Sequence, residues 1–274
     1  MAIGIGALVQ RVSVFRQASA AWTPAELGAS LALWLDADDA STITLNGSTV
    51  SQWNDKSGSS RHVSQASAAN QPGYNTRTLD GKQVVEFSGN QMLFSTASVL
   101  SGNPDVLMAV VVQFDTNFNP SDDRAVQLSA GAGASYAITG GAAGYSSRFN
   151  NGNEIYGPTS LATPLIQIGT RASGSTYDAS QMFISGTESA RTSGASDTGV
   201  PVIGNGVSVG AGAISSDPLG SVGSPMDGFI AETVIAEDVT LATRQRIEGY
   251  LAWKWGLEAN LPAGHPYKST PPTV

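Results

Sequence analysis

The sequence predicts an all-β domain, a two-sheet antiparallel jelly-roll sandwich with one short C-terminal helix packed on it. Three observations lead to this fold class. Strand-like apolar segments are short and numerous, turn signals such as Asn46-Gly47 separate them, and one segment alone has a clear helical period. The chain has 274 residues, of which 41% are hydrophobic and 31 are glycine. Such a chain can bury a sizeable core and contains many turns.

Strand-like segments follow one another at short spacing. We expect strands at 31–35, 49–53, 83–87, 106–114, 124–128, 135–139, 145–149, 165–171, 181–185, 200–209 and 228–235. Further turn dipeptides are Asp80-Gly81, Asn151-Gly152 and Ser185-Gly186. The longest apolar run, from Val106 to Val112, is rich in β-branched residues, so we expect it to lie buried between the sheets.

An amphipathic helix is predicted at 241–255, with Thr240 as its N-cap and Gly256 as its C′ residue. Gly249 inside this helix costs ~1 kcal/mol relative to alanine, which predicts a close approach of the helix backbone to a sheet. The apolar stripe consists of Ile247, Tyr250, Leu251 and Trp255. We expect four tryptophans to pack in the core or under the helix: Trp34, Trp53, Trp253 and Trp255.

The chain divides into an N-terminal arm with a first helical turn at 1–27, the sandwich with its closing helix at 28–258, and a tail at 259–274. Thr23 and Pro24 suit the N-cap and first position of that turn. The arm is expected to pack either on its own domain or on a neighbouring subunit. Its apolar start lacks a basic flank and is interrupted at Gln10-Arg11, so no signal peptide is expected.

Charge and composition exclude several classes of function. The net charge is −8 and no run of Lys or Arg occurs, so the sequence predicts no nucleic-acid binding. No segment approaches the ~20 apolar residues that a membrane span needs. The absence of cysteine removes thiolate metal sites and cysteine nucleophiles.

Three groups of residues carry a resemblance to a known family. They are Leu33-Trp34-Leu35-Asp36-Ala37-Asp38 with Val50-Ser51-Gln52-Trp53-Asn54-Asp55-Lys56-Ser57-Gly58, then Val84-Val85-Glu86-Phe87-Ser88-Gly89, and finally Asp227-Gly228-Phe229-Ile230-Ala231-Glu232 with the block from Ile247 to Leu257. Together with the ending Asn260-Leu261-Pro262 to Tyr267, these segments resemble concanavalin A-like, laminin-G-like jelly-roll domains of phage and marine bacterial proteins. The resemblance implies a jelly roll used for adhesion, glycan contact or assembly, often in virion or surface proteins without known catalysis.

A calcium site is one candidate. Asp36, Asp38, Asp39, Asn54 and Asp55 could offer the oxygen ligands that Ca²⁺ prefers. The same residue types are also ordinary turn formers, and no EF-hand spacing is present. No other cofactor is expected.

A glycan site would need exposed aromatic rings beside polar groups. The candidates are tyrosines near predicted loops or strand ends: Tyr74, Tyr136, Tyr145, Tyr156 and Tyr177. Half-burial at a strand end is the alternative for each of them.

Two catalytic arrangements were weighed. A retaining sandwich glucanase would need Glu-x-Asp-x-x-Glu on one strand, and this spacing is absent; the nearest carboxylate candidates are Glu86, Glu154 and Glu232. The run from Gly206 to Gly210 matches a serine-nucleophile elbow at Ser208, followed by Asp227 and His265, but no helix is predicted after it. The sequence therefore leads us to expect no enzyme.

The leading expectation is a structural or binding protein of a phage virion, in the capsid or tail as a spike, fibre or decoration protein. It would be made in the host cytoplasm and contact other virion proteins, or itself as a homo-oligomer through the N-terminal arm, and perform host-surface glycan contact. The alternatives are a carbohydrate-binding adhesin or lectin module and, third, a polysaccharide hydrolase.

Overall fold

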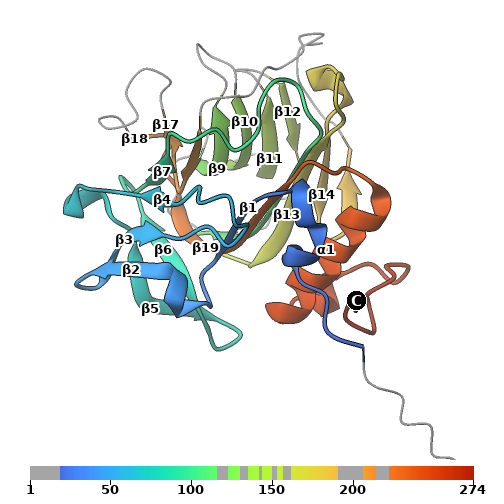
Figure 1. The fold of residues 1–274 in the computed structure, drawn as a ribbon, viewed down its shortest axis with the longest axis horizontal. Helices are drawn as coiled ribbons and strands as arrows, with labels where there is room; N and C mark the ends of the chain where they lie inside the picture. Colours follow the sequence, from blue (N-terminus) through green and yellow to red (C-terminus); the bar gives the residue numbers. More distant parts are fainter. Residues whose placement is uncertain are drawn as a thin grey trace, which may run out of the picture.

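The computed structural model describes residues 19–115, 123–129, 135–141, 144–149, 153–156, 162–190, 206–213 and 222–274 (Figure 1). The arm at 1–18, the Asn151-Gly152 turn and the first part of the predicted strand 200–209 lie outside them. The described chain is mostly antiparallel β-structure with one α-helix, α1 (Leu241–Lys254), which confirms the predicted fold class. None of its helices is both long and apolar enough to span a bilayer.

The strand pairings define two layers. The first contains β1 (Leu31–Asp36), β5 (Gly73–Leu79), β6 (Lys82–Ser88), β8 (Val106–Phe114), β13 (Leu165–Arg171), β14 (Gln181–Ile184), β15 (Thr187–Ser189) and β19 (Asp227–Ala236). The second contains β2 (Ile43–Asn46), β3 (Thr49–Trp53), β4 (Val63–Ser64), β7 (Leu93–Ser95), β9 (Asp123–Ser129), β10 (Ser135–Gly141), β11 (Gly144–Phe149), β12 (Asn153–Tyr156) and β16 (Val207–Val209). A small ribbon pairs β17 (Gly212–Ala213) with β18 (Val222–Gly223). The described chain also contains short 3₁₀ helices: η1 (Pro24–Ser30), η2 (Ala40–Thr42), η3 (Ala68–Asn70), η5 (Tyr177–Ala179) and η6 (Glu258–Asn260).

β19 is central in the first layer. It pairs with β8 along most of its length, and on its other side with β6 and then β1. β13, β14 and β15 follow outward from β8. In the second layer β9 lies between β10 and β16. A single pair, Thr49 with Gly73, joins the two layers at one edge.

β8 shows how the first layer is buried on both faces. Its even-numbered residues from Met108 to Val112 belong to the core between the layers, and its odd-numbered residues from Leu107 to Val111 pack towards α1. All of its residues are buried. The predicted apolar run is continuous rather than alternating because neither face of this strand meets water.

α1 covers the outer face of the first layer (Figure 1). Thr240 caps it through a hydrogen bond that its hydroxyl accepts from the amide of Thr243, and Gly256 follows with a φ of +67°, both as predicted. Gly249 is also closely approached, but by a different partner. A Cβ there would lie 2.6 Å from the Cβ of Tyr267 in the C-terminal tail. The prediction of a sheet at this contact is therefore wrong, because the tail folds back over the helix.

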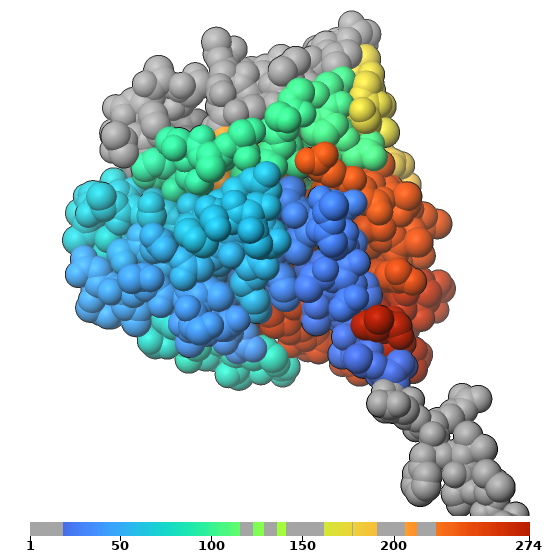
Figure 2. Space-filling view, in the orientation of Figure 1, coloured from blue at the N-terminus to red at the C-terminus, as the bar shows by residue number. Residues whose placement is uncertain are grey.

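The ends of the described chain pair with each other, and Figure 2 shows the red C-terminal segment against the blue N-terminal one. Ala21 forms an isolated antiparallel bridge with Thr273. The amide of Trp22 donates to Pro272 O at 3.1 Å, while its side chain is buried. Thr23 is the N-cap residue of η1 and Pro24 its first residue, as predicted, although the Thr23 side chain makes no capping hydrogen bond.

The tryptophans divide between core and surface. Trp34, Trp53 and Trp255 are buried, as predicted. Trp253 is 37% exposed, and its Nε1 donates to Tyr267 O at 2.8 Å. Its predicted place in the core is wrong because residues two apart on a helix point to different sides, and Trp255 takes the inward one.

Candidate functional site

A β-bulge in β19 turns Glu232 towards α1. The register against β8 shifts between Ile230 and Glu232, so Ala231 is the extra residue. Ile230 belongs to the core between the layers, whereas Ala231 and Val234 pack on the α1 side. Without the bulge, strict alternation would direct Glu232 into the core between the layers.

The Glu232 carboxylate is fully buried, accepts three hydrogen bonds and forms one ion pair. Its Oε1 accepts from Trp34 Nε1 at 2.7 Å and from the Tyr250 hydroxyl at 2.9 Å. Its Oε2 accepts from Trp255 Nε1 at 2.7 Å and lies 2.8 Å from Lys254 Nζ. A buried charge is tolerated only with such partners, so this arrangement holds α1 on the sheet.

Asp36 continues the network with two lysines. Its Oδ1 lies 2.5 Å from Lys254 Nζ, and its Oδ2 lies 2.8 Å from Lys56 Nζ. Lys56 also pairs with Asp39 at 2.8 Å and lies 4.4 Å from the centre of the Trp34 ring. The segments around Asp36, Lys56, Glu232 and Lys254 are those that carry the family resemblance. In the structure these segments dock the helix on the sheet, and the family resemblance itself stays a prediction.

Burial dominates the protonation chemistry of this network. It raises the pKa of Glu232, while the ammonium of Lys254 acts in the opposite direction. Burial and the neighbouring Glu232 carboxylate together raise the pKa of Tyr250 far above its usual value. Both carboxylate oxygens of Glu232 are saturated with donors, which leaves this group no part in ligand binding.

Two of the first three calcium candidates, Asp36 and Asp39, are largely neutralised by lysine. Asp36 and Asp39 both contact Lys56, and hydrogen bonding to Lys56 lowers the pKa of Asp39. Asp39 also caps η2 by accepting from the amide of Ser41. Asp38 is exposed, and its amide donates to Asp36 Oδ1.

The other two candidates are bound within their own loop. The Asp55 carboxylate accepts from the amides of Trp34, Ser57 and Arg61. Asn54 Oδ1 accepts from the Gln52 side chain at 2.6 Å. Across the part of the chain that the structure describes, no three His, Asp or Glu residues are grouped to hold a metal. These contacts do not support the calcium prediction.

Two of the predicted sugar-binding tyrosines are core residues. Tyr74 is 3% exposed, and its hydroxyl donates to Ala37 O at 2.8 Å. Tyr136 is fully buried between the layers, where a Cβ on Gly169 would lie 2.5 Å from its hydroxyl oxygen. The prediction that these two rings stack on sugar is wrong, because strand pairing turns both of them inward.

The remaining tyrosines lie at strands or turns whose backbone alone is described. Tyr145 lies in β11, Tyr156 in β12, and Tyr177 begins η5. Their side chains are outside the described part of the structure, so their role in sugar binding stays a prediction. Tyr177 directly precedes the pocket described next.

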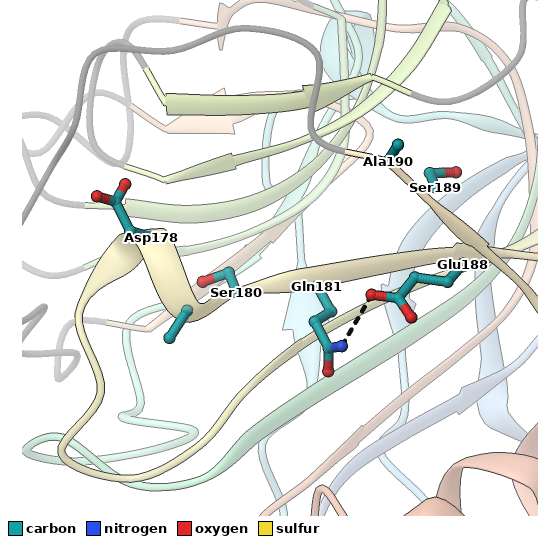
Figure 3. A pocket seen from close by; sticks show the side chains of 7 residues that line it. Asp178, Ser180, Gln181, Glu188, Ser189 and Ala190 are labelled. Atoms are coloured by element: carbon teal, nitrogen blue, oxygen red, sulfur yellow. Dashed lines mark hydrogen bonds between the residues drawn. The ribbon is translucent and has the colours of Figure 1, made fainter.

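An open pocket of about 570 Å³ lies where η5 meets the β14–β15 hairpin (Figure 3). Its lining residues are Asp178, Ala179, Ser180, Gln181, Glu188, Ser189 and Ala190. The turn of this hairpin is the one predicted at Ser185-Gly186, both of which have positive φ angles, whereas its second strand was not predicted. The sequence did not predict the pocket, although a two-residue turn at 185–186 places position 188 opposite 183 and makes 181 its diagonal neighbour.

Gln181 and Glu188 form the polar centre of this pocket. Glu188 pairs in register with Phe183, which makes Gln181 its diagonal cross-strand neighbour. The Gln181 amide donates to Glu188 Oε1 at 2.8 Å (Figure 3). Within the described residues, the second oxygen of Glu188 and the carbonyl oxygen of Gln181 accept no hydrogen bond. Both side chains are exposed, so a bound ligand can reach these atoms.

The structure does not bring together the residues of the two candidate catalytic arrangements, the serine-nucleophile elbow and the paired carboxylates. Ser208 lies within strand β16 in the second layer, whereas His265, in the C-terminal tail, contacts the buried Glu248 of α1 at 3.0 Å. Ser208 is thus in a strand that β17 follows with no helix between them, and His265 packs on the helix that covers the first layer, so the two do not form a serine-nucleophile site. Glu232 is fully buried, and Glu86 lies 3.7 Å from Arg77 at the opposite edge of the first layer. The Glu154 side chain lies outside the described residues.

No family model matches the sequence, and no curated protein does. Solved structures do share the fold. Domain 4 of AbnA, a GH43 extracellular arabinanase from Geobacillus stearothermophilus, was solved in complex with arabinotriose; it is 10% identical with a TM-score of 0.51, over 78% of this chain and 96% of that domain. A GH54 α-L-arabinofuranosidase is 17% identical with a TM-score of 0.54, over 73% of this chain and 50% of that one.

A sialidase from Trypanosoma rangeli, in complex with difluorosialic acid, is 12% identical with a TM-score of 0.52, over 78% of this chain. The present chain spans about a third of that enzyme, 32% of its length. At these identities the likeness establishes the shared fold. The fold is therefore one that occurs in carbohydrate-active proteins.

One expectation from the sequence changes in this light. The expectation of no enzyme is corrected, since the neighbours named above are glycoside hydrolases or a domain of one. The shared fold thus offers no ground for setting an enzyme aside. The phage virion setting gains no support from these neighbours, and it stays a prediction together with the virion location and partners.

Proposed function

We propose that the protein recognises carbohydrate, and that its ligand site is the pocket between η5 and the β14–β15 hairpin. The observation that carries the proposal is the exposed Gln181–Glu188 pair, with acceptor atoms that the fold leaves unused. Sugar hydroxyls pair readily with amide and carboxylate groups of this kind. The fold supports the same conclusion, because Domain 4 of AbnA was solved with arabinotriose bound.

Titration calorimetry with arabinotriose tests the proposal. Gln181→Ala and Glu188→Gln should each weaken binding about five- to tenfold, since each removes hydrogen bonds worth roughly 1 kcal/mol. Thr187→Ala is the matched control, because Thr187 lies on the same exposed hairpin and does not line the pocket. A wild-type protein that binds no oligosaccharide, or pocket variants that bind as tightly as the control, would contradict the proposal.

Glycosidic-bond hydrolysis is the second candidate. The specific observation in its favour is that two carboxylates, Asp178 and Glu188, line one open pocket. Glycoside hydrolases use two carboxyl groups, one as acid and the other as base or nucleophile. Release of reducing ends from arabinan, lost in both Asp178→Asn and Glu188→Gln, would support hydrolysis. Binding without such release would leave recognition as the function.

A further inference from the structure

The hairpin that carries the pocket lies at the margin of the first layer. β15 has three residues, and of the described strands β14 is the one that pairs with it. A short outer strand of this kind opens more readily than the strands of a core. Gln181 and Glu188 meet across this hairpin, so the geometry of the pocket depends on what holds the hairpin against the rest of the domain.

α1 supports the face of the hairpin. Phe183 lies opposite Glu188 in the pairing of β14 with β15, so the two side chains share one face. That face is the one that α1 covers, and Phe183 is buried there in the apolar cluster under the helix. Cζ of Arg244, near the start of α1, lies 3.7 Å from the centre of the Phe183 ring, well within the range of a cation–π contact.

The C-terminal tail supports the turn of the same hairpin. A Cβ on Gly186 would lie 3.0 Å from Pro262 Cδ and 3.3 Å from His265 Cδ2, so the turn packs directly on the tail. The buried Glu248 of α1 joins the two supports. Its Oε1 lies 2.5 Å from Arg244 Nη1, and its Oε2 lies 3.0 Å from His265 Nε2. One buried carboxylate thus sets the places of both side chains.

We infer that Arg244 and His265, joined through Glu248, are positioning residues for the pocket, which keep Gln181 and Glu188 in the geometry that a bound sugar needs. The inference rests on the proposed function and adds how the affinity of that site is set. Neither Arg244 nor His265 lines the pocket, so both act on the ligand through the hairpin. When these supports are lost, the hairpin is competent to bind for only a fraction of the time, and the apparent affinity falls by that fraction.

Calorimetry with arabinotriose measures the effect, under conditions where the variants are folded. Arg244→Ala should weaken binding at least about threefold, the shift expected from the loss of a cation–π contact. Arg244→Lys keeps a cation for Glu248 but lacks the flat guanidinium that covers Phe183, so it should weaken binding about twofold. The lysine variant decides the question if Arg244→Ala does not fold. His265→Ala, which removes the support under the turn, should weaken binding in the same direction.

Two controls separate positioning from stability. Arg246→Ala removes an exposed arginine from the same helix and should leave the affinity unchanged. Val63→Ala removes buried apolar atoms from β4 in the second layer, so it lowers the global stability and should also leave the affinity unchanged. Amide hydrogen exchange adds a measurement that needs no sugar. In both Arg244 variants the amides of residues 181–189 should exchange faster, while those of β8 exchange as in the wild type.

Unchanged affinity in Arg244→Ala and Arg244→Lys overturns the inference, while recognition of carbohydrate stands. An equal loss of affinity in Val63→Ala overturns it too, because global stability would then explain the effect. Wild-type protein that binds no oligosaccharide contradicts the proposed function. Exchange at 181–189 that stays the same in both Arg244 variants contradicts the positioning role, whatever the result with sugar.

Discussion

Lys254 Nζ lies 2.5 Å from Oδ1 of Asp36, a residue 218 positions earlier in the chain. The same ammonium lies 2.8 Å from Oε2 of the fully buried Glu232. One lysine near the end of α1 thus neutralises two buried carboxylates that β1 and β19 bring together. The helix is docked by this charge network as well as by its apolar stripe.

Removing the lysine should be costly. Lys254→Met leaves Asp36 with Lys56 alone and Glu232 with no cation, so we expect a loss of about 3–5 kcal/mol in the free energy of unfolding. Urea denaturation followed by tryptophan fluorescence measures it. Lys82→Met, which breaks a surface pair with Asp80, should cost less than about 1 kcal/mol. Equal losses in the two variants would show that the network contributes little.

Gly249→Ala tests the contact between α1 and the tail. Helix propensity alone would stabilise the variant by about 1 kcal/mol. The new Cβ would, however, lie 2.6 Å from the Cβ of Tyr267, and overpacking of this kind costs about 1–3 kcal/mol. We expect a net loss of stability by thermal denaturation. In a Tyr267→Ala background the same change should be neutral or stabilising; a loss of the same size there would exclude Tyr267 as the cause.

The ion pair between Arg77 and Asp115 should account for part of the stability that the protein loses in acid. Arg77 donates two hydrogen bonds to the Asp115 carboxylate, at 2.6 and 2.9 Å, and this lowers the pKa of Asp115 below its usual 3.8. A lowered pKa means that the pair's stabilisation is present above pH 3.8 and is lost as the pH falls through the pKa of the folded state. Both side chains are partly exposed, so the effect is below about 1 kcal/mol.

Denaturation midpoints of Asp115→Asn and wild type should therefore converge as the pH falls below 4 or so. At neutral pH the variant should be the less stable of the two. Glu26→Gln, which removes an exposed carboxylate in η1 away from Arg77 and Asp115, serves as the control. A difference between Asp115→Asn and wild type that stays constant with pH would refute the linkage.

Calcium should not stabilise the protein through the acidic loop. Asp36 and Asp39 are paired with Lys56, and the Asp55 carboxylate accepts three backbone hydrogen bonds. Binding there would have to displace these partners. We expect the thermal midpoint to be the same in millimolar calcium and in EDTA. A rise in calcium that Asp38→Asn abolishes would restore the calcium site predicted from the sequence.

The elements that the sequence predicted best are those whose signal is local. β8 was recognised from an unbroken apolar run, and α1 from Thr240, Gly256 and a 3–4 stripe. Each pattern reports on residues within one turn or one strand. The tertiary partner of Gly249 was not local, and there the prediction named a sheet where the chain uses its own tail.

The positions of the candidate site residues could not be predicted from local sequence patterns in the same way. Glu232 faces α1 because of a bulge whose cause is the pairing with β8, and no sequence pattern marks that shift. Tyr74 and Tyr136 looked exposed near strand ends, but strand pairing turned them inward. No sequence pattern marks Gln181 and Glu188, and only the hairpin brings them together in the pocket that we propose as the carbohydrate site.

Chemical-shift mapping by NMR, with arabinotriose titrated into isotope-labelled protein, tests the central claim most directly. The account predicts that the largest shifts of backbone amides fall on residues 178–190 and disappear in Glu188→Gln. Shifts concentrated elsewhere on the protein, or saturable binding that leaves 178–190 unperturbed, would contradict the assignment of this pocket as the carbohydrate site.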